Sequence, residues 1–184
     1  MVVVVDYHVG NVLSVLNACK RVGLEADLAT HIDKADGIIL PGVGAFPVAM
    51  ENLHKMGLVE QLRKTKKPML GICLGMQILF EKGYENYACE GLGLLSGTVD
   101  LIKTDAKLPH MGWNTLSKTN KDVYFVHSYM AEFNETTIEY AEYAAVKIPA
   151  IVGRDHVMGF QFHPEKSGAV GETLLKEWKE KWRL

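Results

Sequence analysis

A cysteine lies between two glycines in the stretch Gly71-Ile72-Cys73-Leu74-Gly75. An apolar run precedes it and a helix-like run over Leu74–Lys82 follows, so we expect a tight turn from a strand into a helix. Such a turn strains its central residue, and side chains two residues away would collide unless those residues are glycine. The pattern predicts a nucleophilic Cys73 at a helix N-terminus, where backbone N–H groups favour a thiolate and can bind an oxyanion.

Taken alone, the same pattern also fits a small buried cysteine in a strand-to-helix turn, because short motifs often match by chance. The other cysteines carry no comparable signal. Cys19 is expected on an apolar helix face, and Cys89 is expected in a loop without partner residues. A second motif is therefore needed to favour catalysis.

His163 and Glu165 stand two residues apart in the segment Gly159–Lys166, with Pro164 between them. On an extended backbone both side chains point the same way, and Pro164 biases His163 towards that conformation. Glu165 can then accept a hydrogen bond from one imidazole nitrogen while the other nitrogen faces the cysteine. This is the nucleophile–base–orienter arrangement of a triad, so the two motifs together favour acyl transfer.

A glycine-rich loop, Pro41-Gly42-Val43-Gly44, follows the predicted strand Ile38–Leu40. Its glycines allow the backbone to approach a ligand or a peptide to change orientation, although an ordinary loop has the same composition. No Gly-Lys-Ser/Thr follows it, and no G-x-G-x-x-G occurs near Asp6–Asn11, which disfavours nucleotide binding. The histidines and cysteines lack zinc-ligand spacing, so we expect no metal and no cofactor.

The composition is that of one globular domain, residues 1–184, with 48% hydrophobic residues. A net charge of −2 gives no electrostatic case for nucleic acid or an anionic membrane. No apolar run is long enough to span a bilayer, and Met1 leads into Val2–Val5 without a basic signal-peptide region. Three cysteines without framework spacing favour a reducing compartment, so we expect a cytoplasmic protein.

The pattern of apolar residues predicts strands separated by helices in the first part of the chain and short strands after Gly97. Strands separated by helices imply parallel pairing with right-handed crossovers. We therefore expect an α/β fold with one open, mixed, mostly parallel sheet and helices on both faces. The expected strands are Val2–Val5, Ile38–Leu40, Met69–Ile72, Thr98–Ile102, Val123–Val126, Thr137–Tyr143, Ala150–Gly153 and Val157–Phe162; the expected helices are Val12–Cys19, Phe46–Lys66 and a last one over Val170–Trp182.

These motifs resemble those of the triad-type, class I glutamine amidotransferases, and in particular the glutaminase subunits of imidazole glycerol phosphate synthase from histidine biosynthesis. The similarity covers nearly the whole chain and includes PGVGAF, GICLGMQILFE and GFQFHPEKS. Leu108–Asn114 and Phe125–Tyr129 are similar to that subunit rather than to the family at large. Asp6–Asn11 is similar to its opening loop, although His8 stands where the family usually has glycine, and Glu85–Lys107 is short for the family. The resemblance implies a flavodoxin-like fold.

The resemblance implies that Cys73 attacks the side-chain amide of glutamine, giving an oxyanion and then a thioester. His163 moves the proton and Glu165 orients His163. The N–H groups of Leu74 and, after a peptide flip, of Val43 would bind the oxyanion. The implied glutamine-binding positions are Gly42, Gln77, Glu85, Ser128 and Tyr129.

For several of these positions a plainer interpretation stays open from the residues alone. Gln77 could lie on a helix surface, Glu85 could be a solvated loop acid, and Ser128 and Tyr129 could simply pack in a strand. Trp113, in a strand-like run, would ordinarily belong to the core.

Free ammonia is protonated and escapes in water, so a glutaminase of this kind needs a channel into a second protein. The resemblance implies a heterodimer with a (β/α)₈ cyclase subunit, which makes imidazole glycerol phosphate and AICAR. It places Asn11, Trp113 and His127 at that interface.

Three other functions remain open. The first is a stand-alone cysteine hydrolase of similar fold, and the second is a non-catalytic regulatory subunit. The third is the same glutaminase chemistry serving another acceptor, such as one in a surface-sugar pathway. Consumption of glutamine rather than of peptides or aldehydes distinguishes the first, and the intact Cys73, His163 and Glu165 count against the second. Only the partner identifies the acceptor.

Overall fold

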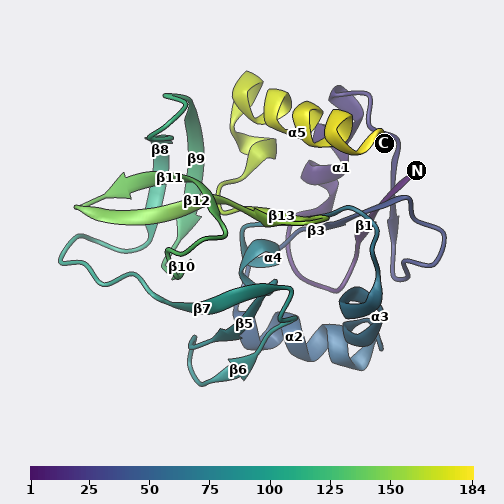
Figure 1. Ribbon diagram of the computed structural model, residues 1–184, viewed down its shortest axis with the longest axis horizontal. Helices are drawn as coiled ribbons and strands as arrows, with labels where there is room; N and C mark the ends of the chain where they lie inside the picture. Colours follow the sequence, from purple (N-terminus) through teal and green to yellow (C-terminus); the bar gives the residue numbers. More distant parts are fainter.

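The computed structural model describes residues 1–184 and is built around a seven-stranded sheet in the order β11-β12-β13-β4-β3-β1-β2 (Figure 1). Strands β2, β1, β3, β4 and β13 are parallel to one another. Strand β12 pairs antiparallel with β13, and β11 pairs antiparallel with β12. The mixed, mostly parallel sheet is therefore confirmed. Its strands are β1 Val2–Val5, β2 Ala26–Ala29, β3 Gly37–Leu40, β4 Met69–Ile72, β11 Thr137–Tyr143, β12 Val146–Arg154 and β13 Val157–Phe160.

Helices cover both faces of this sheet, as predicted (Figure 1). Helices α1 (Val12–Arg21) and α5 (Gly168–Trp182) pack on one face, where the alternate residues of β1, Val2 and Val4, are buried. Helices α2 (Phe46–Lys55) and α3 (Val59–Lys64) pack on the other face. Central strands must be apolar on both sides in such an arrangement, which explains the unbroken valine run of β1. No helix combines the length and the apolar character needed to cross a membrane.

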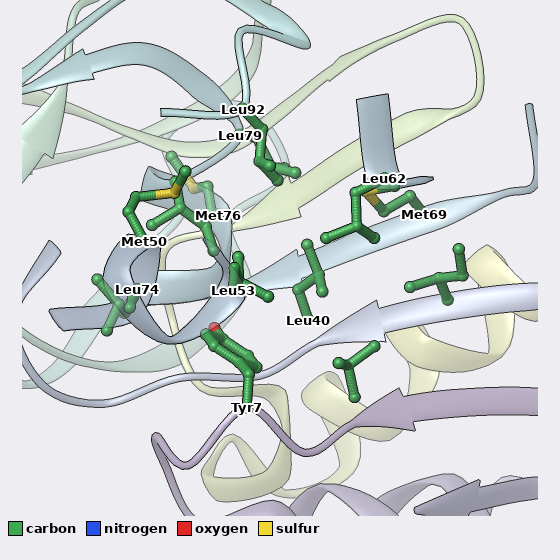
Figure 2. Packing of buried hydrophobic residues seen from close by; sticks show 14 of the residues in the cluster. Tyr7, Leu40, Met50, Leu53, Leu62, Met69, Leu74, Met76, Leu79 and Leu92 are labelled. Carbon is green, nitrogen blue, oxygen red and sulfur yellow. The ribbon is translucent and has the colours of Figure 1, made fainter. Parts of the chain in front are cut away.

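The core under α2 and α3 extends to Leu74, the residue that follows Cys73 (Figure 2). Leu74 and Met76, on the short helix α4 (Leu74–Gln77), are buried in the same cluster as Tyr7 and Leu40. Interiors of this kind are closely packed and resist displacement. The backbone that follows the nucleophile is thus fixed by the core. Figure 2 labels Tyr7, Leu40, Met50, Leu53, Leu62, Met69, Leu74, Met76, Leu79 and Leu92.

Two smaller sheets stand beside the central one, so the expectation of a single sheet is wrong. The predicted strand Thr98–Ile102 belongs largely to β7 of a four-stranded sheet, and Val123–Val126 belongs to β9 of a two-stranded hairpin. Local residue patterns indicate that a strand forms but not which distant strand it pairs with. The additional strands are β5 Phe80–Gly83, β6 Cys89–Glu90, β7 Leu95–Leu101, β8 His110–Thr115, β9 Asp122–His127 and β10 Tyr129–Ala131.

The helix expected over Leu74–Lys82 is also wrong, because α4 ends at Gln77 and β5 begins at Phe80. Ile78 and Leu79 are fully buried, and their carbonyls accept hydrogen bonds from the loop that precedes β7. An apolar run that is buried on every side has no periodicity that separates helix from strand. The short α4 nevertheless leaves the predicted strand-to-helix turn in place.

Candidate active site

Cys73 occupies the turn between β4 and α4 with a backbone φ of 53° and ψ of −110°. A Cβ atom on Gly75 would lie 1.8 Å from the carbonyl oxygen of Leu40, and one on Gly71 would lie 2.4 Å from the carbonyl oxygen of Gly75. Real Cβ atoms do not approach backbone so closely. The predicted need for glycine on both sides of the strained cysteine is therefore confirmed.

His163 and Glu165 form a buried pair directly after β13. Nδ1 of His163 lies 2.7 Å from Oε1 of Glu165, and both side chains are almost completely buried. Nε2 of His163 is also buried and makes no other hydrogen bond within the chain. Burial lowers the pKa of His163, but its interactions with the nearby Cys73 and with the hydrogen-bonded Glu165 outweigh burial and raise the pKa to about 10. An imidazolium beside the Cys73 sulfur is thus favoured at neutral pH.

The cysteine sulfur has a further polar neighbour that the sequence motifs did not identify. Nε2 of Gln161 donates towards Sγ of Cys73 at 3.8 Å, and Gln161 is completely buried. Its Oε1 accepts a hydrogen bond from Nε2 of Gln77 at 3.1 Å. Gln161 stands two residues before His163 on an extended segment, and this spacing was the available signal that both side chains face the same way.

The glycine-rich loop lies against the first amide after the nucleophile. The Leu74 N–H donates to the carbonyl of Gly42 at 3.3 Å. The C=O and N–H of a trans peptide point in opposite directions, so the Val43 N–H points away from Leu74. The preceding carbonyl, that of Pro41, accepts a hydrogen bond from the hydroxyl of Tyr7. Burial, and then the neighbouring Cys73, raise the pKa of Tyr7, which keeps this hydroxyl protonated.

A cavity of about 300 Å³ opens beside Cys73 and brings most of the predicted binding residues together. A cavity of this size suits a small molecule with a few polar groups. Gly42 does not line it and acts on it only through the Leu74 amide. The lining residues are Val43, Gly44, Cys73, Leu74, Gln77, Glu85, Pro109, Val126, His127, Ser128 and Tyr129.

The plainer interpretations of Gln77 and Glu85 do not fit the structure. Gln77 is buried, and its Nε2 donates to the Tyr129 carbonyl at 2.9 Å, so it does not lie on a helix surface. Oε2 of Glu85 accepts a hydrogen bond from the Phe46 N–H at 2.8 Å, at the start of α2. Glu85 thus lines the cavity while it caps a helix that has no other side-chain cap.

The residues predicted for a partner interface differ in exposure. Trp113, on β8, is 60% exposed, so the alternative of a core tryptophan is wrong. Asn11 is exposed and caps α1, where its side chain accepts a hydrogen bond from the Ser14 N–H. His127 is only 6% exposed, and its ring bonds to His110 and faces the cavity rather than the outer surface.

The sequence is similar to known proteins over nearly its full length. Residues 3–180 match the family described as Glutamine amidotransferase class-I. The chain is 50% identical to the Lactococcus lactis protein named "Imidazole glycerol phosphate synthase subunit HisH", with 97% of this chain and 98% of that protein covered. It is 49% identical to the protein of the same name from Exiguobacterium sibiricum, with 98% and 95% covered.

Solved structures share the fold of this chain. One, described as "Crystal structure of glutamine amidotransferase", superposes with a TM-score of 0.79 at 20% identity and covers all of both chains. PurLQS from Thermotoga maritima superposes with a TM-score of 0.71 at 17% identity, over 98% of this chain and 97% of that chain. At such identities the likeness establishes only the fold, whereas membership of the family rests on the match of residues 3–180. This chain belongs to the class-I glutamine amidotransferase family.

Proposed function

We propose that this chain is the glutaminase subunit of an imidazole glycerol phosphate synthase. It hydrolyses L-glutamine to glutamate and ammonia, and it passes the ammonia to a cyclase subunit. The observation that carries the glutaminase half is the placement of Cys73 in a strained turn beside the buried His163–Glu165 pair and a cavity of about 300 Å³. The identity of about half the residues to proteins named as that subunit supports the pathway.

The reaction follows from the charges at the site. The Cys73 thiolate attacks the carboxamide carbon of glutamine, and the amide oxygen becomes an oxyanion. The His163 imidazolium gives its proton to the departing nitrogen, the C–N bond breaks, and a glutamyl thioester and ammonia result. Neutral His163 then takes a proton from water, whose oxygen attacks the thioester. Glutamate leaves as the thiolate and the imidazolium form again.

Oxyanion stabilisation requires a change at the glycine-rich loop. The Leu74 N–H would be one donor, but it is occupied by the Gly42 carbonyl. Rotation of the Gly42–Val43 peptide would free that amide and turn the Val43 N–H towards the same point. The φ of +130° at Gly44 is one that only glycine adopts readily, which gives the loop room for such a rotation.

The ammonia requires a second subunit. At neutral pH free ammonia is mostly ammonium, which is not nucleophilic, so the product must move to the acceptor without meeting water. The proposed partner is a (β/α)₈ cyclase that makes imidazole glycerol phosphate and AICAR, in a heterodimer. The exposed side chains of Trp113 and Met111 on β8 offer an apolar contact of the kind that subunit interfaces use, and Asn11 is proposed to join it.

The test combines the chain with a histidine-pathway cyclase and its ribulosyl substrate. We expect glutamine-dependent synthesis, which Cys73→Ala abolishes while synthesis from ammonium salts continues. Loss of the ammonium-dependent reaction in a folded, bound Cys73→Ala variant would contradict the assigned role of Cys73. Glutamine hydrolysis without any complex or product would instead indicate a different acceptor or a stand-alone hydrolase.

A further inference from the structure

A chain of buried and partly buried hydrogen bonds runs from β8 to the wall of the cavity. Nδ2 of Asn114 lies 3.1 Å from Nε2 of His110. Nδ1 of His110 lies 3.0 Å from Nε2 of His127, and Nδ1 of His127 lies 2.8 Å from the carbonyl oxygen of Tyr129. Both histidines are buried, and the reaction described above uses neither of them.

Only one arrangement of protons on two neutral rings satisfies these bonds. The Tyr129 carbonyl can only accept, so Nδ1 of His127 carries the proton. Nε2 of His127 then accepts, which places the proton of His110 on Nδ1. Nε2 of His110 must accept in turn, and the amide of Asn114 donates to it. Every hydrogen bond in the chain therefore points from Asn114 towards Tyr129.

The direction of the chain is set at Asn114, because two backbone groups fix its amide. Its Nδ2 also donates to the carbonyl of Glu142 at 2.9 Å, and its Oδ1 accepts from the Thr115 N–H at 2.8 Å. With the amide held in this way, a donor rather than an acceptor faces His110.

The surroundings keep both rings in place and uncharged. His110 is stacked between Phe125 and Tyr143, with ring centroids 4.7 Å and 4.3 Å away. Burial lowers the pKa of His110 to about 4. Burial, followed by the charges of His110 and His163, lowers the pKa of His127 to about 3 despite its bond to the Tyr129 carbonyl.

The inner end of the chain meets the catalytic side chains. The Tyr129 carbonyl accepts from His127 on one side and from Gln77 on the other, so both of its lone pairs are used. Gln77 also donates to Gln161, which donates towards the Cys73 sulfur. The position of this one carbonyl therefore affects both the cavity wall and the amides beside the nucleophile.

We infer that His110 and Asn114 are positioning residues of the glutaminase site, which fix the Nδ1–H form of His127 and thereby hold the Tyr129 carbonyl in place. The inference rests on the proposed function in that glutamine is the molecule the cavity receives. Neither residue lines the cavity, so both act through His127 and Tyr129. Asn114 is the neighbour of exposed Trp113 on β8, so a protein bound to that strand would touch the outer end of the chain.

Asn114→Asp tests the direction of the chain. A carboxylate only accepts, so His110 must carry its proton on Nε2 and present a lone pair to His127. His127 then carries its proton on Nε2, and its bare Nδ1 faces the Tyr129 carbonyl. We expect the KM for glutamine in the partner complex to rise on the order of tenfold or more, as for an unmade buried hydrogen bond. Asn114→Ala removes the donor without imposing the opposite direction, so its effect should be smaller.

A pH profile separates positioning from general damage. With aspartate at position 114, one added proton on His110 restores every bond, since the imidazolium donates at both nitrogens. The KM of the variant should therefore fall from pH 8 to pH 6, whereas the wild type shows no such recovery. The other ionisable groups nearby are His163, which faces His127, Tyr143, which stacks on His110, and Cys73. Because wild type and variant share them, their titration cancels in the comparison.

Two substitutions at His127 form a matched pair. In His127→Asn the side-chain amide nitrogen can take the place of Nδ1 and donate to the Tyr129 carbonyl. In His127→Gln the amide nitrogen lies near the place of Nε2, so the Tyr129 carbonyl loses this donor. We expect a larger increase in KM for His127→Gln. Equal increases would contradict the part assigned to the Nδ1–H group.

Nitrogen-15 NMR of the isolated chain reads the tautomers without any activity. In the wild type both rings should be neutral Nδ1–H forms at pH 7, and Asn114→Asp should change them. A wild-type His127 protonated on Nε2, or an unchanged KM in Asn114→Asp, would overturn the inference. If the wild type yields no glutamate even with the cyclase, the proposed function fails, while the NMR result still decides the tautomers.

Discussion

The Leu74 N–H donates to the Gly42 carbonyl at 3.3 Å, and this contact blocks one of the two proposed oxyanion donors. The second donor, the Val43 N–H, points away because the peptide is trans. The proposed nucleophile and base are thus in place, whereas the two proposed oxyanion donors are not yet aimed at a common point. Catalysis should therefore depend on the orientation of a single peptide group.

We predict that the isolated chain hydrolyses glutamine only slowly. Loss of one oxyanion donor usually costs about 10²–10³ in rate, so the cyclase with its acceptor ligand should raise glutamate release by that factor or more. The measurement is steady-state glutamate release by the chain alone, with the cyclase, and with the cyclase and ligand. Comparable rates in all three would contradict control by the peptide and favour a stand-alone hydrolase.

The two members of the His163–Glu165 pair should differ in importance. His163→Ala removes the proton carrier and should lower the glutaminase kcat on the order of 10²–10⁴. Glu165→Gln keeps the shape of the group 2.7 Å from Nδ1, and the imidazole stays in place, so the loss should be smaller. Single-turnover glutamate release by the partner complex makes the comparison. Equal, nearly complete losses would show that Glu165 does more than orient the ring.

Gly75→Ala should prevent the turn from forming. The added Cβ would lie 1.8 Å from the backbone oxygen of Leu40, which no rotamer change relieves. Gly93→Ala is the control: its φ of +64° is left-handed, so alanine is strained there, but nothing lies within 4 Å of the added atom. We expect the control to lose only about 1–2 kcal/mol of unfolding free energy. Denaturant unfolding of both variants checks this, and a Gly75→Ala chain as stable as the control would contradict the packing argument.

The two halves of the proposed triad were predictable because the geometry of each half is local. Gly71 and Gly75 exclude side chains from the turn at Cys73, and the two-residue spacing of His163 and Glu165 turns both side chains to one side. Each constraint acts within a few residues, so it is visible in the sequence. The two glycines and the pair reached the expected positions in the structure.

Features that depend on distant pairing were not predictable in the same way. His127 was expected at a partner interface, but its contacts with His110 and Tyr129 exist only because β8, β9 and β10 meet near the cavity. The Leu74–Lys82 run was mistaken for one helix because most of its apolar residues are buried on all sides, and such a run has no periodicity that separates helix from strand. In both cases tertiary pairing decides, and it leaves no local pattern.

The buried histidines predict how stability changes with pH. In the unfolded chain a histidine titrates near 6.5, whereas burial lowers the pKa of His110 to about 4 and of His127 to about 3. Between these values the unfolded chain binds more protons, so the unfolding free energy falls as the pH falls below about 6.5. His163 has the opposite sign: its pKa is raised in the folded chain, so its contribution is present below about 6.5 and is lost as the pH rises through the folded value.

We therefore expect the isolated chain to lose stability between pH 6.5 and pH 4.5, by at most about 1.4 kcal/mol per pH unit for each of the two neutral histidines. His110→Phe keeps a ring between Phe125 and Tyr143 but removes one titrating group, so its curve should be shallower than that of the wild type. Urea unfolding at several pH values gives both curves. The difference between the two slopes decides the question. If His110 were charged in the folded chain, the unfolding free energies of the variant and the wild type would change equally with pH. Parallel curves would thus show that this ring is not held neutral, and the direction of the chain from Asn114 to Tyr129 would have to be abandoned with it.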